Sequence, residues 1–384
     1  MKVIYILPTN SIFAGDNLSV INLILGLRKY DVSPLVVVSK ESSLTERLDT
    51  LNIPYNIINY TPTAYMPVCR TWNDYLRFPK NLITHFVHYY MSAIKLIPII
   101  RRFKPDIIHS NTGSTMAGYL VCKYCSMPHV WHVREYLDLD FDVRLLISKR
   151  KHRRRLSEFG NHVIAITQGI FDYYNLSGKD RVIYNGVLRE IDASFCSNKE
   201  KYFLFVGRLT EKKGVGQLIK AFINFASFDS QISLFLAGSP VDEKYFVGLT
   251  NTVRDCGLES RIVFLGDRTD IYDLMRKAIA LIVPSVFEGF GRITAEAMFN
   301  GCLVIGNNSA GTKEILASDN LGILYNGHEE LSNHLKSVAN SGVDNFLPII
   351  IRAQEHAVKF FSQERNAMEV YGYYSEILKN RIGR

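Results

Sequence analysis

Two glutamates separated by a glycine-containing segment are the residues best suited to chemistry in this chain. Glu288 and Glu296 have seven residues between them, and that segment begins with 289–291, Gly-Phe-Gly. The apolar run 281–283 precedes it and predicts a buried strand, and a helix is predicted from about Thr294. Ligands of parallel sheets bind where strands end. We therefore expect both carboxylates at a ligand site.

The chemistry of this segment points to a nucleotide-sugar. A carboxylate accepts two hydrogen bonds side by side, which suits the neighbouring hydroxyls of a ribose or a hexose. Free amides around Phe290 and Gly291, at the start of the predicted helix, can face an anion such as phosphate. The alternative is simpler: a surface loop, followed by a helix glutamate that the helix dipole favours.

Two cations follow the predicted strand 202–206. Arg208 suits a phosphate by its forked geometry, and Lys213 suits it as a point charge. They could neutralise a departing diphosphate in place of a metal, and we see no acidic cluster on a comparable loop. The sequence therefore predicts a metal-independent reaction without a cofactor. The alternative, a salt-bridged surface group of Glu211, Lys212 and Lys213, fits Lys212 better than the other lysine.

These motifs resemble the retaining glycosyltransferases of family 4, which have the GT-B fold. The E-x7-E hallmark of that family reads EGFGRITAE here. Three further motifs stand in the family's order, so that the resemblance covers essentially the full chain: VIYNGV at 182–187, VGRLTEKKG at 206–214 and AGTKE at 310–314.

The resemblance implies a role for each motif residue. Glu296 would bind the ribose, Glu288 with the amides of Gly289, Phe290 and Gly291 would hold the donor sugar, and Arg208 with Lys213 would hold the diphosphate. Gly238 and the loop with Arg268 would lie near the phosphate and the base. The implied catalytic residues are Glu288, His132, Arg208 and Lys213. The acceptor hydroxyl would attack from the face that the diphosphate leaves, because the family retains configuration without a clear protein nucleophile.

The first half of the chain carries two further candidates. Family members usually have two glycines after the first strand, whose amides meet the donor phosphate or the acceptor; this chain has only Gly15 there, between Ala14 and Asp16. The alternative is a helix-entry loop capped by Asp16 or Asn17. Family members also place a histidine beside the transferred sugar, and His132, followed by Arg134 and Glu135, is the best match. The alternative is a core histidine.

The order of predicted elements indicates two α/β domains. A chain of 384 residues is long for one core. Short apolar strands alternate with helical patterns in both halves, which predicts two doubly wound Rossmann-like domains, and the family implies that they face a cleft. We expect an acceptor-side domain at 1–190, a nucleotide-sugar-binding domain at 191–362, and a helix at 363–384 that returns to the first domain.

Charge and hydropathy limit the partners. The net charge of +8 admits nucleic acid, an anionic membrane or an anionic substrate. The basic run 149–155 is either a solvated helix face or a contact with anionic lipid, and the aromatic stretch 60–86 lies where related enzymes touch membranes. No recognition motif favours nucleic acid. We expect a cytoplasmic protein, since the most apolar segment, 82–100, contains two histidines, a lysine and a proline.

The leading interpretation is a glycosyltransferase that moves a sugar from a nucleotide donor to a glycan or a lipid-linked acceptor, as in cell-surface polysaccharide synthesis. Two alternatives are a nucleotide-sugar epimerase of the same fold and a catalytically silent subunit that only binds a nucleotide-sugar. No GxGxxG follows the first strand, so a dehydrogenase is not favoured.

Overall fold

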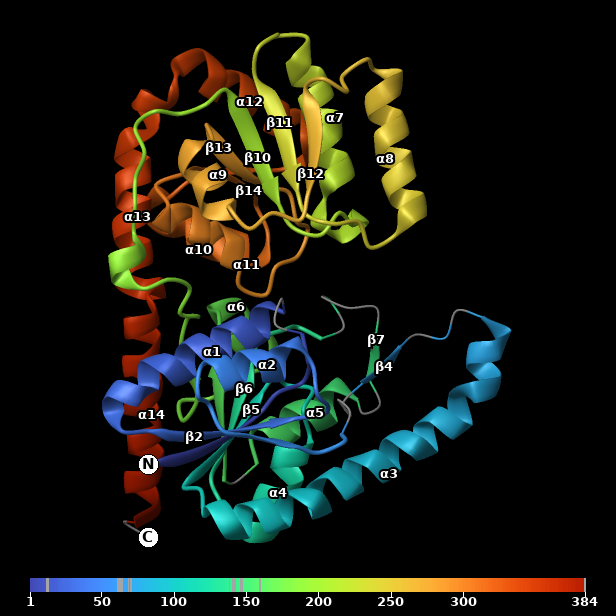
Figure 1. The fold of residues 1–384 in the computed structure, drawn as a ribbon, viewed down its shortest axis with the longest axis vertical. Helices are drawn as coiled ribbons and strands as arrows, with labels where there is room; N and C mark the ends of the chain where they lie inside the picture. The colour runs from blue at the N-terminus through green and yellow to red at the C-terminus, as the bar shows by residue number, and fades with distance from the viewer. Residues whose placement is uncertain are drawn as a thin grey trace. The chain divides into compact units, whose positions relative to one another are not determined.

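A computed structural model describes residues 1–11, 14–60, 65–67, 69, 71–137, 139, 143–145, 148–158 and 160–382. The chain divides into two compact units (Figure 1): unit 1 comprises 1–186 with 363–384, and unit 2 comprises 187–362. Each unit holds a parallel sheet with helices on its faces, so the expected pair of doubly wound, Rossmann-like domains is confirmed.

The unit 1 sheet has the strand order β3-β2-β1-β5-β6-β8-β9 in the described residues. Its strands are β1 (Lys2–Ile6), β2 (Ser33–Val38), β3 (Tyr55–Ile57), β5 (Ile107–Asn111), β6 (His129–Val133), β8 (Asn161–Ala165) and β9 (Arg181–Val182). A separate antiparallel pair joins β4 (Tyr65–Pro67) to β7 (Val143–Leu145). From β1 the chain adds strands first on one side and later on the other. The carboxyl ends of β1 and β5 therefore border the topological switch point.

Helices cover both faces of this sheet. They are α1 (Gly15–Leu27), α2 (Ser43–Thr50), α3 (Trp72–Phe103), α4 (Ala117–Cys125), α5 (Lys149–Leu156), α6 (Gln168–Tyr173) and α14 (Gln363–Ile382), with a 3₁₀ turn η1 (Arg28–Tyr30). On one face α14 crosses α1 and packs against it (Figure 1), so closely that a Cβ added to Gly26 would lie 2.7 Å from the Cβ of Ala367. The C-terminal helix thus belongs to the core of unit 1.

Helix α3 begins at Trp72, ten residues before the apolar segment 82–100 that stands out in the sequence. Thr71 and Asp74 form a reciprocal capping box, in which the Thr71 amide donates to Asp74 Oδ2 at 2.8 Å. The helix continues through Pro79 and Pro98. The cap explains why the helix starts this early.

The unit 2 sheet has the order β12-β11-β10-β13-β14-β15. Its strands are β10 (Tyr202–Val206), β11 (Ser233–Ala237), β12 (Ile262–Gly266), β13 (Ala280–Val283), β14 (Leu303–Asn307) and β15 (Ile323–Tyr325). Around them lie α7 (Val215–Ala226), α8 (Glu243–Asp255), α9 (Ile271–Lys277), α10 (Arg292–Phe299), α11 (Ala310–Ala317), α12 (Gly327–Ser341) and α13 (Leu347–Phe361), and the 3₁₀ turns η2 (Glu190–Asp192), η3 (Glu211–Lys213), η4 (Ser318–Asn320) and η5 (Val343–Phe346). The switch point here lies between β10 and β13.

Candidate active site

Three glycines end neighbouring strands of unit 2 and allow their main chains to approach closely. Gly207, Gly238 and Gly266 all have positive φ and lie at the carboxyl ends of β10, β11 and β12. A Cβ on Gly238 would lie 2.1 Å from the Gly207 carbonyl oxygen, and the Gly238 amide donates to the Gly266 carbonyl at 2.8 Å. No side chain fits at Gly238. The predicted ligand edge is therefore lined by main chain at this point.

A second close approach brings Lys213 to Glu288. Gly214, at φ +71°, follows η3, and a Cβ there would lie 2.1 Å from the Pro284 carbonyl oxygen, at the end of β13. This contact places the Lys213 ammonium 2.5 Å from Glu288 Oε1. The side chains are 28% and 16% exposed, so the ion pair is only partly covered. The structure thus joins two predicted site residues from different motifs.

The loop 288–291 is fixed by the start of α11. The Gly311 amide donates to the Glu288 carbonyl at 2.9 Å, and a Cβ on Gly311 would lie 2.4 Å from the Phe290 carbonyl oxygen. The Phe290 ring is buried edge-on against Phe361, with centroids 5.4 Å apart. Gly291, at φ +87°, directly precedes α10, which begins two residues earlier than expected. The AGTKE motif therefore supports the loop of the E-x7-E motif.

Glu296 lies on α10 and is held by a residue that sequence analysis missed. Arg292 Nε donates to Glu296 Oε1 at 2.8 Å, and Arg292 Nη2 donates to the Val187 carbonyl at 3.3 Å. Burial raises the pKa of Glu296, and the Arg292 guanidinium opposes that rise. The spacing of four residues on a helix is the signal that could have identified Arg292 as a partner.

The two predicted arginines of unit 2, Arg208 and Arg268, do not hold a glutamate of the E-x7-E motif as Arg292 does. Arg208 follows β10 and is exposed, and in the described ranges no ion pair involves it. Arg268 is also exposed, but its Nη2 lies 2.6 Å from Asp270 Oδ2. A contact of Arg268 with a nucleotide would therefore compete with Asp270, whereas Arg208 faces no such competition from the described acidic residues.

At the unit 1 edge, Gly15 is the first residue of α1, after an N-cap at Ala14. The alternative of an Asp16 or Asn17 cap is wrong. Asn17 instead donates from Nδ2 to the Thr9 and Ser11 carbonyls and to the Thr9 hydroxyl, which ties the loop back to itself. The family implied amide contacts for Gly15, and its place beside the switch point is compatible with that expectation.

His132 is fully buried on β6, and Arg134 lies beyond it at the strand end. Burial, the Arg134 guanidinium and His109 together hold the pKa of His132 well below its usual value. Arg134 donates from Nε to Asn111 Oδ1 at 2.6 Å, from Nη1 to Asn185 Oδ1, and from Nη2 to His132 Nδ1 at 3.2 Å. Sequence analysis gave Arg134 no role. Its position two residues after His132 places it on the same side of the strand, which was the available signal.

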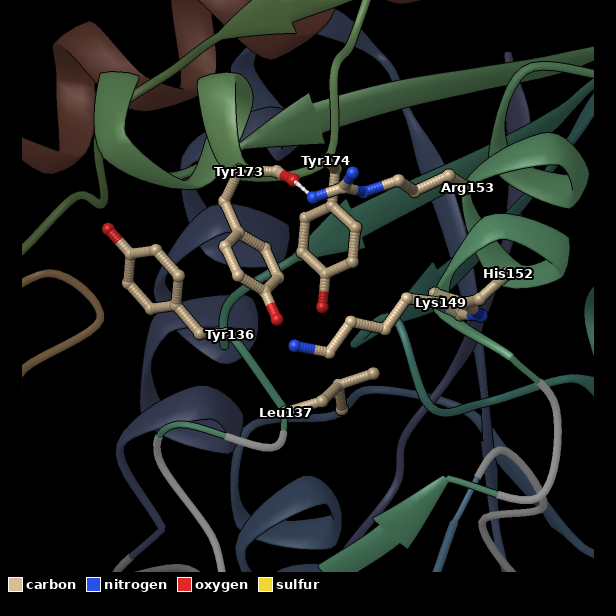
Figure 2. Close-up of a pocket in the computed structure, with 7 residues that line it drawn as sticks. All are labelled: Tyr136, Leu137, Lys149, His152, Arg153, Tyr173 and Tyr174. Atoms are coloured by element: carbon tan, nitrogen blue, oxygen red, sulfur yellow. Dashed lines mark hydrogen bonds between the residues drawn. The ribbon is translucent and has the colours of Figure 1, made fainter.

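The basic run 149–155 forms α5 and is only partly solvated. Its buried member is His152, whose pKa burial lowers to about 4. The cations of Lys149 and Arg153 each lie 5.4 Å from the centroid of the Tyr173 ring. In Figure 2 the Lys149 ammonium and the hydroxyls of Tyr173 and Tyr174 point into one small hollow. The run therefore has a solvated helix face, formed by Lys149, Arg150, Lys151 and Arg154, and a second face that packs on unit 1.

The described part of the chain contains neither a cluster of metal ligands nor a helix suited to span a membrane. No group of three or more His, Cys, Asp or Glu side chains is arranged to hold a metal ion. No helix in those residues combines the length and hydropathy needed to cross a bilayer. Cys122 and Cys125 are spaced as a CxxC motif and lie on α4. Cys122 is buried, Cys125 is half-buried, and both are free thiols.

Comparison with known proteins gives consistent matches. Residues 18–190 match the family described as Glycosyltransferase Family 4, and residues 189–347 match Glycosyl transferases group 1. An uncharacterized glycosyltransferase of Methanocaldococcus jannaschii is 28% identical over 79% of this chain and 75% of its own length. An N-acetylgalactosaminyltransferase of Campylobacter jejuni that acts on a diphospho-undecaprenol compound is 28% identical over 40% of this chain and 42% of its own.

Solved structures show the same fold. The HepE protein of Anabaena, in complex with UDP, superposes with a TM-score of 0.79 at 20% sequence identity, covering 98% of this chain and all of that one. The two family matches together span both units, in the order that the motifs require. The chain belongs to family 4 of the glycosyltransferases, with the GT-B fold.

Proposed function

We propose that this glycosyltransferase is a retaining, metal-independent enzyme. It moves a sugar from a nucleoside diphosphate sugar to a glycan or a lipid-linked acceptor, in cell-surface polysaccharide synthesis. The observation that carries this proposal is the Lys213–Glu288 ion pair, 2.5 Å apart, at the carboxyl edge of the unit 2 sheet and next to the start of α10. The UDP-bound HepE structure and the lipid-linked substrate of the Campylobacter enzyme support the proposed donor and acceptor classes.

The ion pair can exchange partners when the donor binds. A partly exposed pair of this kind contributes about 0–1 kcal/mol, so opening it costs little. Lys213 would then contact the diphosphate, together with the exposed Arg208 and the amides at the start of α10. Glu288 would be released to accept hydrogen bonds from sugar hydroxyls. This set of cations supplies the positive charge that a metal ion supplies in other transferases.

Glu296 would bind the ribose. Its carboxylate is 8% exposed and oriented by Arg292, so it presents a fixed acceptor to two adjacent hydroxyls. The ionised form is the better acceptor, and Arg292 favours that form against the effect of burial. Because the Arg292 guanidinium orients it, the Glu296 carboxylate is suited to recognise the ribose hydroxyls. Glu288, by contrast, is suited to exchange Lys213 for sugar hydroxyls when the donor binds.

The proposed reaction balances without a protein nucleophile. The acceptor oxygen forms a bond to the anomeric carbon on the face from which the diphosphate leaves, the bond from that carbon to the phosphate oxygen breaks, and the acceptor proton passes to the departing phosphate. Negative charge grows on the diphosphate in the transition state. Lys213 and Arg208 stabilise that charge more strongly than they stabilise the bound donor, which is the requirement for catalysis.

We further propose that the enzyme is cytoplasmic and binds the inner face of the membrane through unit 1. Helix α3 has its buried residues only from Tyr89 onward. Before and around that point it exposes large apolar side chains on one helical face: Trp72, Leu76, Ile83, Val87, Tyr90 and Ile94. Trp72 is 84% exposed. Such a face next to exposed basic residues suits an anionic bilayer surface.

The function is tested by nucleotide-sugar turnover. We expect release of nucleoside diphosphate from one member of a donor panel that includes UDP-glucose, dependent on an acceptor and unchanged in EDTA. Glu296→Gln and Arg208→Ala should each lower turnover at least tenfold. Unchanged turnover in both variants would show that the site is assigned wrongly. Conversion of the donor without acceptor would favour the epimerase, and binding without turnover would favour the silent subunit.

Membrane binding is tested by co-sedimentation with vesicles. We expect the protein to pellet with vesicles that contain phosphatidylserine and less with vesicles of phosphatidylcholine alone. The double variant Trp72→Ser, Ile83→Ser should bind more weakly. The matched control is Phe228→Ser, which removes an exposed aromatic ring from unit 2. Equal binding by the two variants would contradict a role of α3.

A further inference from the structure

A row of polar side chains crosses the apolar face of unit 1 that α14 covers. His109 on β5, His132 on β6 and Tyr374 on α14 are all fully buried, among core residues such as Val130 and Val370. Burying polar groups in an apolar core costs free energy unless their hydrogen bonds are made. The partners of these groups are therefore informative about why the core retains them.

The contacts form a continuous chain that ends at Arg134. The Tyr374 hydroxyl lies 2.6 Å from His109 Nδ1. His109 Nε2 lies 3.2 Å from His132 Nδ1, and Arg134 Nη2 lies 3.2 Å from the same His132 nitrogen. We call these four residues the imidazole chain.

Arg134 fixes the direction of every hydrogen bond in the imidazole chain. A guanidinium in a protein stays protonated, so Arg134 donates and His132 Nδ1 accepts. Burial and the neighbouring Arg134 keep the pKa of His132 well below its usual value, so the ring is neutral and carries its one proton on Nε2. His109 Nε2 faces the same acceptor and must donate to it. His109 Nδ1 then accepts from the Tyr374 hydroxyl.

In this assignment the proton on His132 Nε2 has no acceptor within the imidazole chain. His132 Nε2 is buried, and among the described residues it has no hydrogen-bond partner. A buried donor without an acceptor costs about 1–3 kcal/mol, so such a group calls for an explanation. His132 lies near the carboxyl end of β6, and its register partner is Asn111 at the carboxyl end of β5, where ligands of this fold bind.

We propose that Arg134 is a positioning residue, which fixes His132 as a neutral hydrogen-bond donor to an oxygen atom of the substrate. This inference rests on the proposed function. It excludes His132 as a general base, because Nδ1 already accepts from Arg134 and Nε2 carries a proton. It also gives a role to the VIYNGV motif, since Asn185 of that motif accepts a hydrogen bond from Arg134 Nη1 and Asn111 accepts one from Nε. These two side-chain amides thus hold the guanidinium against His132.

The proton position can be measured directly in the free enzyme. In protein labelled with ¹⁵N in the histidine rings, two-bond ¹H–¹⁵N correlation at neutral pH distinguishes protonated from unprotonated nitrogens, and the His132 signals are assigned by their loss in His132→Phe. We expect a proton on Nε2 and none on Nδ1. A proton on Nδ1, or a charged ring, in the wild-type enzyme would overturn the proposal without any variant.

Variants then test the role of Arg134. Arg134→Met should mix the two neutral forms of His132, because the obligatory donor is gone, and Arg134→Lys should restore the Nε2 form. The matched control Arg181→Met removes a unit 1 guanidinium that contacts Glu376, and it should leave the His132 signals unchanged. An unaltered Nε2 form in Arg134→Met would refute the positioning role. These measurements need no turnover, so a failure of the proposed function would be seen separately.

Substrate contact is tested by two further measurements. The donor that turns over should shift the His132 Nε2 signal, whereas UDP alone should not; an unchanged signal with that donor would mean that the buried donor meets water instead, and would overturn the substrate contact. Arg134→Met and His132→Phe should each lower kcat/KM about tenfold, and the double variant should lose no more than either alone. Losses that multiply to about a hundredfold would show that Arg134 does not act through His132.

Discussion

The carboxyl edges of the two sheets are built from different chemistry. In unit 2 the edge carries ion pairs on loops that glycines hold in place, and the Lys213–Glu288 pair is partly open to solvent. In unit 1 the edge is buried around the guanidinium of Arg134, which donates to Asn111 and His132 and lies near the Asp16 carboxyl. Both sheets are parallel and doubly wound, so the fold does not account for the difference.

The difference separates two tasks that one transferase needs. A partly exposed ion pair can change partners at little cost, which suits a site that must accept a charged diphosphate and release it. A buried hydrogen-bonded network cannot rearrange without leaving a donor or acceptor unsatisfied, which suits fixed orientation. We therefore expect charge changes in unit 2 to affect activity more than stability, and proton uptake in unit 1 to affect stability.

The largest effect is expected from Lys213→Ala. Loss of this cation removes stabilisation of the departing diphosphate, and kcat/KM should fall by about 10²–10³. The free energy of unfolding should change by less than about 1 kcal/mol, because the pair with Glu288 is partly exposed. Steady-state kinetics and urea unfolding measure the two quantities. The matched control is Lys212→Ala, one residue away and exposed, which should keep full activity. Equal losses in both variants would contradict the assignment.

The next largest effect is expected from acid on unit 1. Burial lowers the pKa of His129 and of His152 to about 4, and holds those of His109 and His132 well below the usual 6.5. Between about pH 6.5 and pH 4 the unfolded chain binds protons that the folded unit does not. Stability is therefore complete above pH 6.5 and is lost as the pH falls, by about 2 kcal/mol at pH 5 for each of His129 and His152, and in the same direction for His109 and His132.

Tryptophan fluorescence measures this loss selectively. Both tryptophans, Trp72 and the buried Trp131, lie in unit 1, so the urea midpoint of the fluorescence change reports on that unit. We expect this midpoint to fall between pH 7 and pH 5. The urea midpoint of unit 2, measured by hydrogen exchange in peptides from 187–362, should fall less over the same pH range. A parallel fall in both units would mean that the buried histidines are not the cause.

Features that depend on neighbouring residues in the sequence were predicted well, and features that depend on residues far apart in the sequence were not. Strands β10 and β13 are continuous apolar runs, so the predicted strands 202–206 and 281–283 end within one residue of those observed, and Glu288 with its glycines was located from local spacing. The apolar segment 82–100 did not indicate the first ten residues of α3, because a polar capping box of Thr71 and Asp74 sets that start. The Lys213–Glu288 contact was only anticipated as proximity, since it depends on Gly214 packing on Pro284, 70 residues away in sequence.

Partners of site residues were the least predictable feature. Arg292 and Arg134 each hold a predicted residue, and local spacing gave only a weak signal for them: four residues from Glu296 on a helix, and two residues after His132 on a strand. The Arg134 contacts join three segments, the end of β5, the end of β6 and the residues after β9, which only the sheet order brings together. The resemblance to the family located His132 and could not reveal the imidazole chain behind it, because that chain includes Tyr374 from the last helix.

Arg292→Ala should have an effect of intermediate size and would sharpen the contrast with Arg134. Without Arg292, nothing opposes the rise that burial causes in the pKa of Glu296, so a larger fraction of this carboxyl is protonated as the pH falls. We expect KM for the donor to rise about tenfold, with a smaller change in kcat, and the rise to be steeper at pH 6 than at pH 8. Kinetics across this pH range test it, with Arg276→Ala in the same unit as the control. A KM ratio independent of pH would contradict the role of Arg292 on Glu296.

The smallest effect is expected from Tyr374→Phe, which removes the far end of the imidazole chain. The loss of one buried hydrogen bond should destabilise unit 1 by about 1 kcal/mol, or 2–4 °C in Tm. The neighbouring Tyr373 provides a matched control, because its hydroxyl donates to the Lys179 carbonyl at 2.7 Å and lies outside the imidazole chain. Both variants should lose similar stability, but only Tyr374→Phe should shift the ring signals of His109. Shifts of equal size in both variants would show that the histidines respond to general loosening of α14 rather than to the hydrogen bond, and the distinction between an oriented unit 1 and an exchangeable unit 2 would then rest on Arg134 alone.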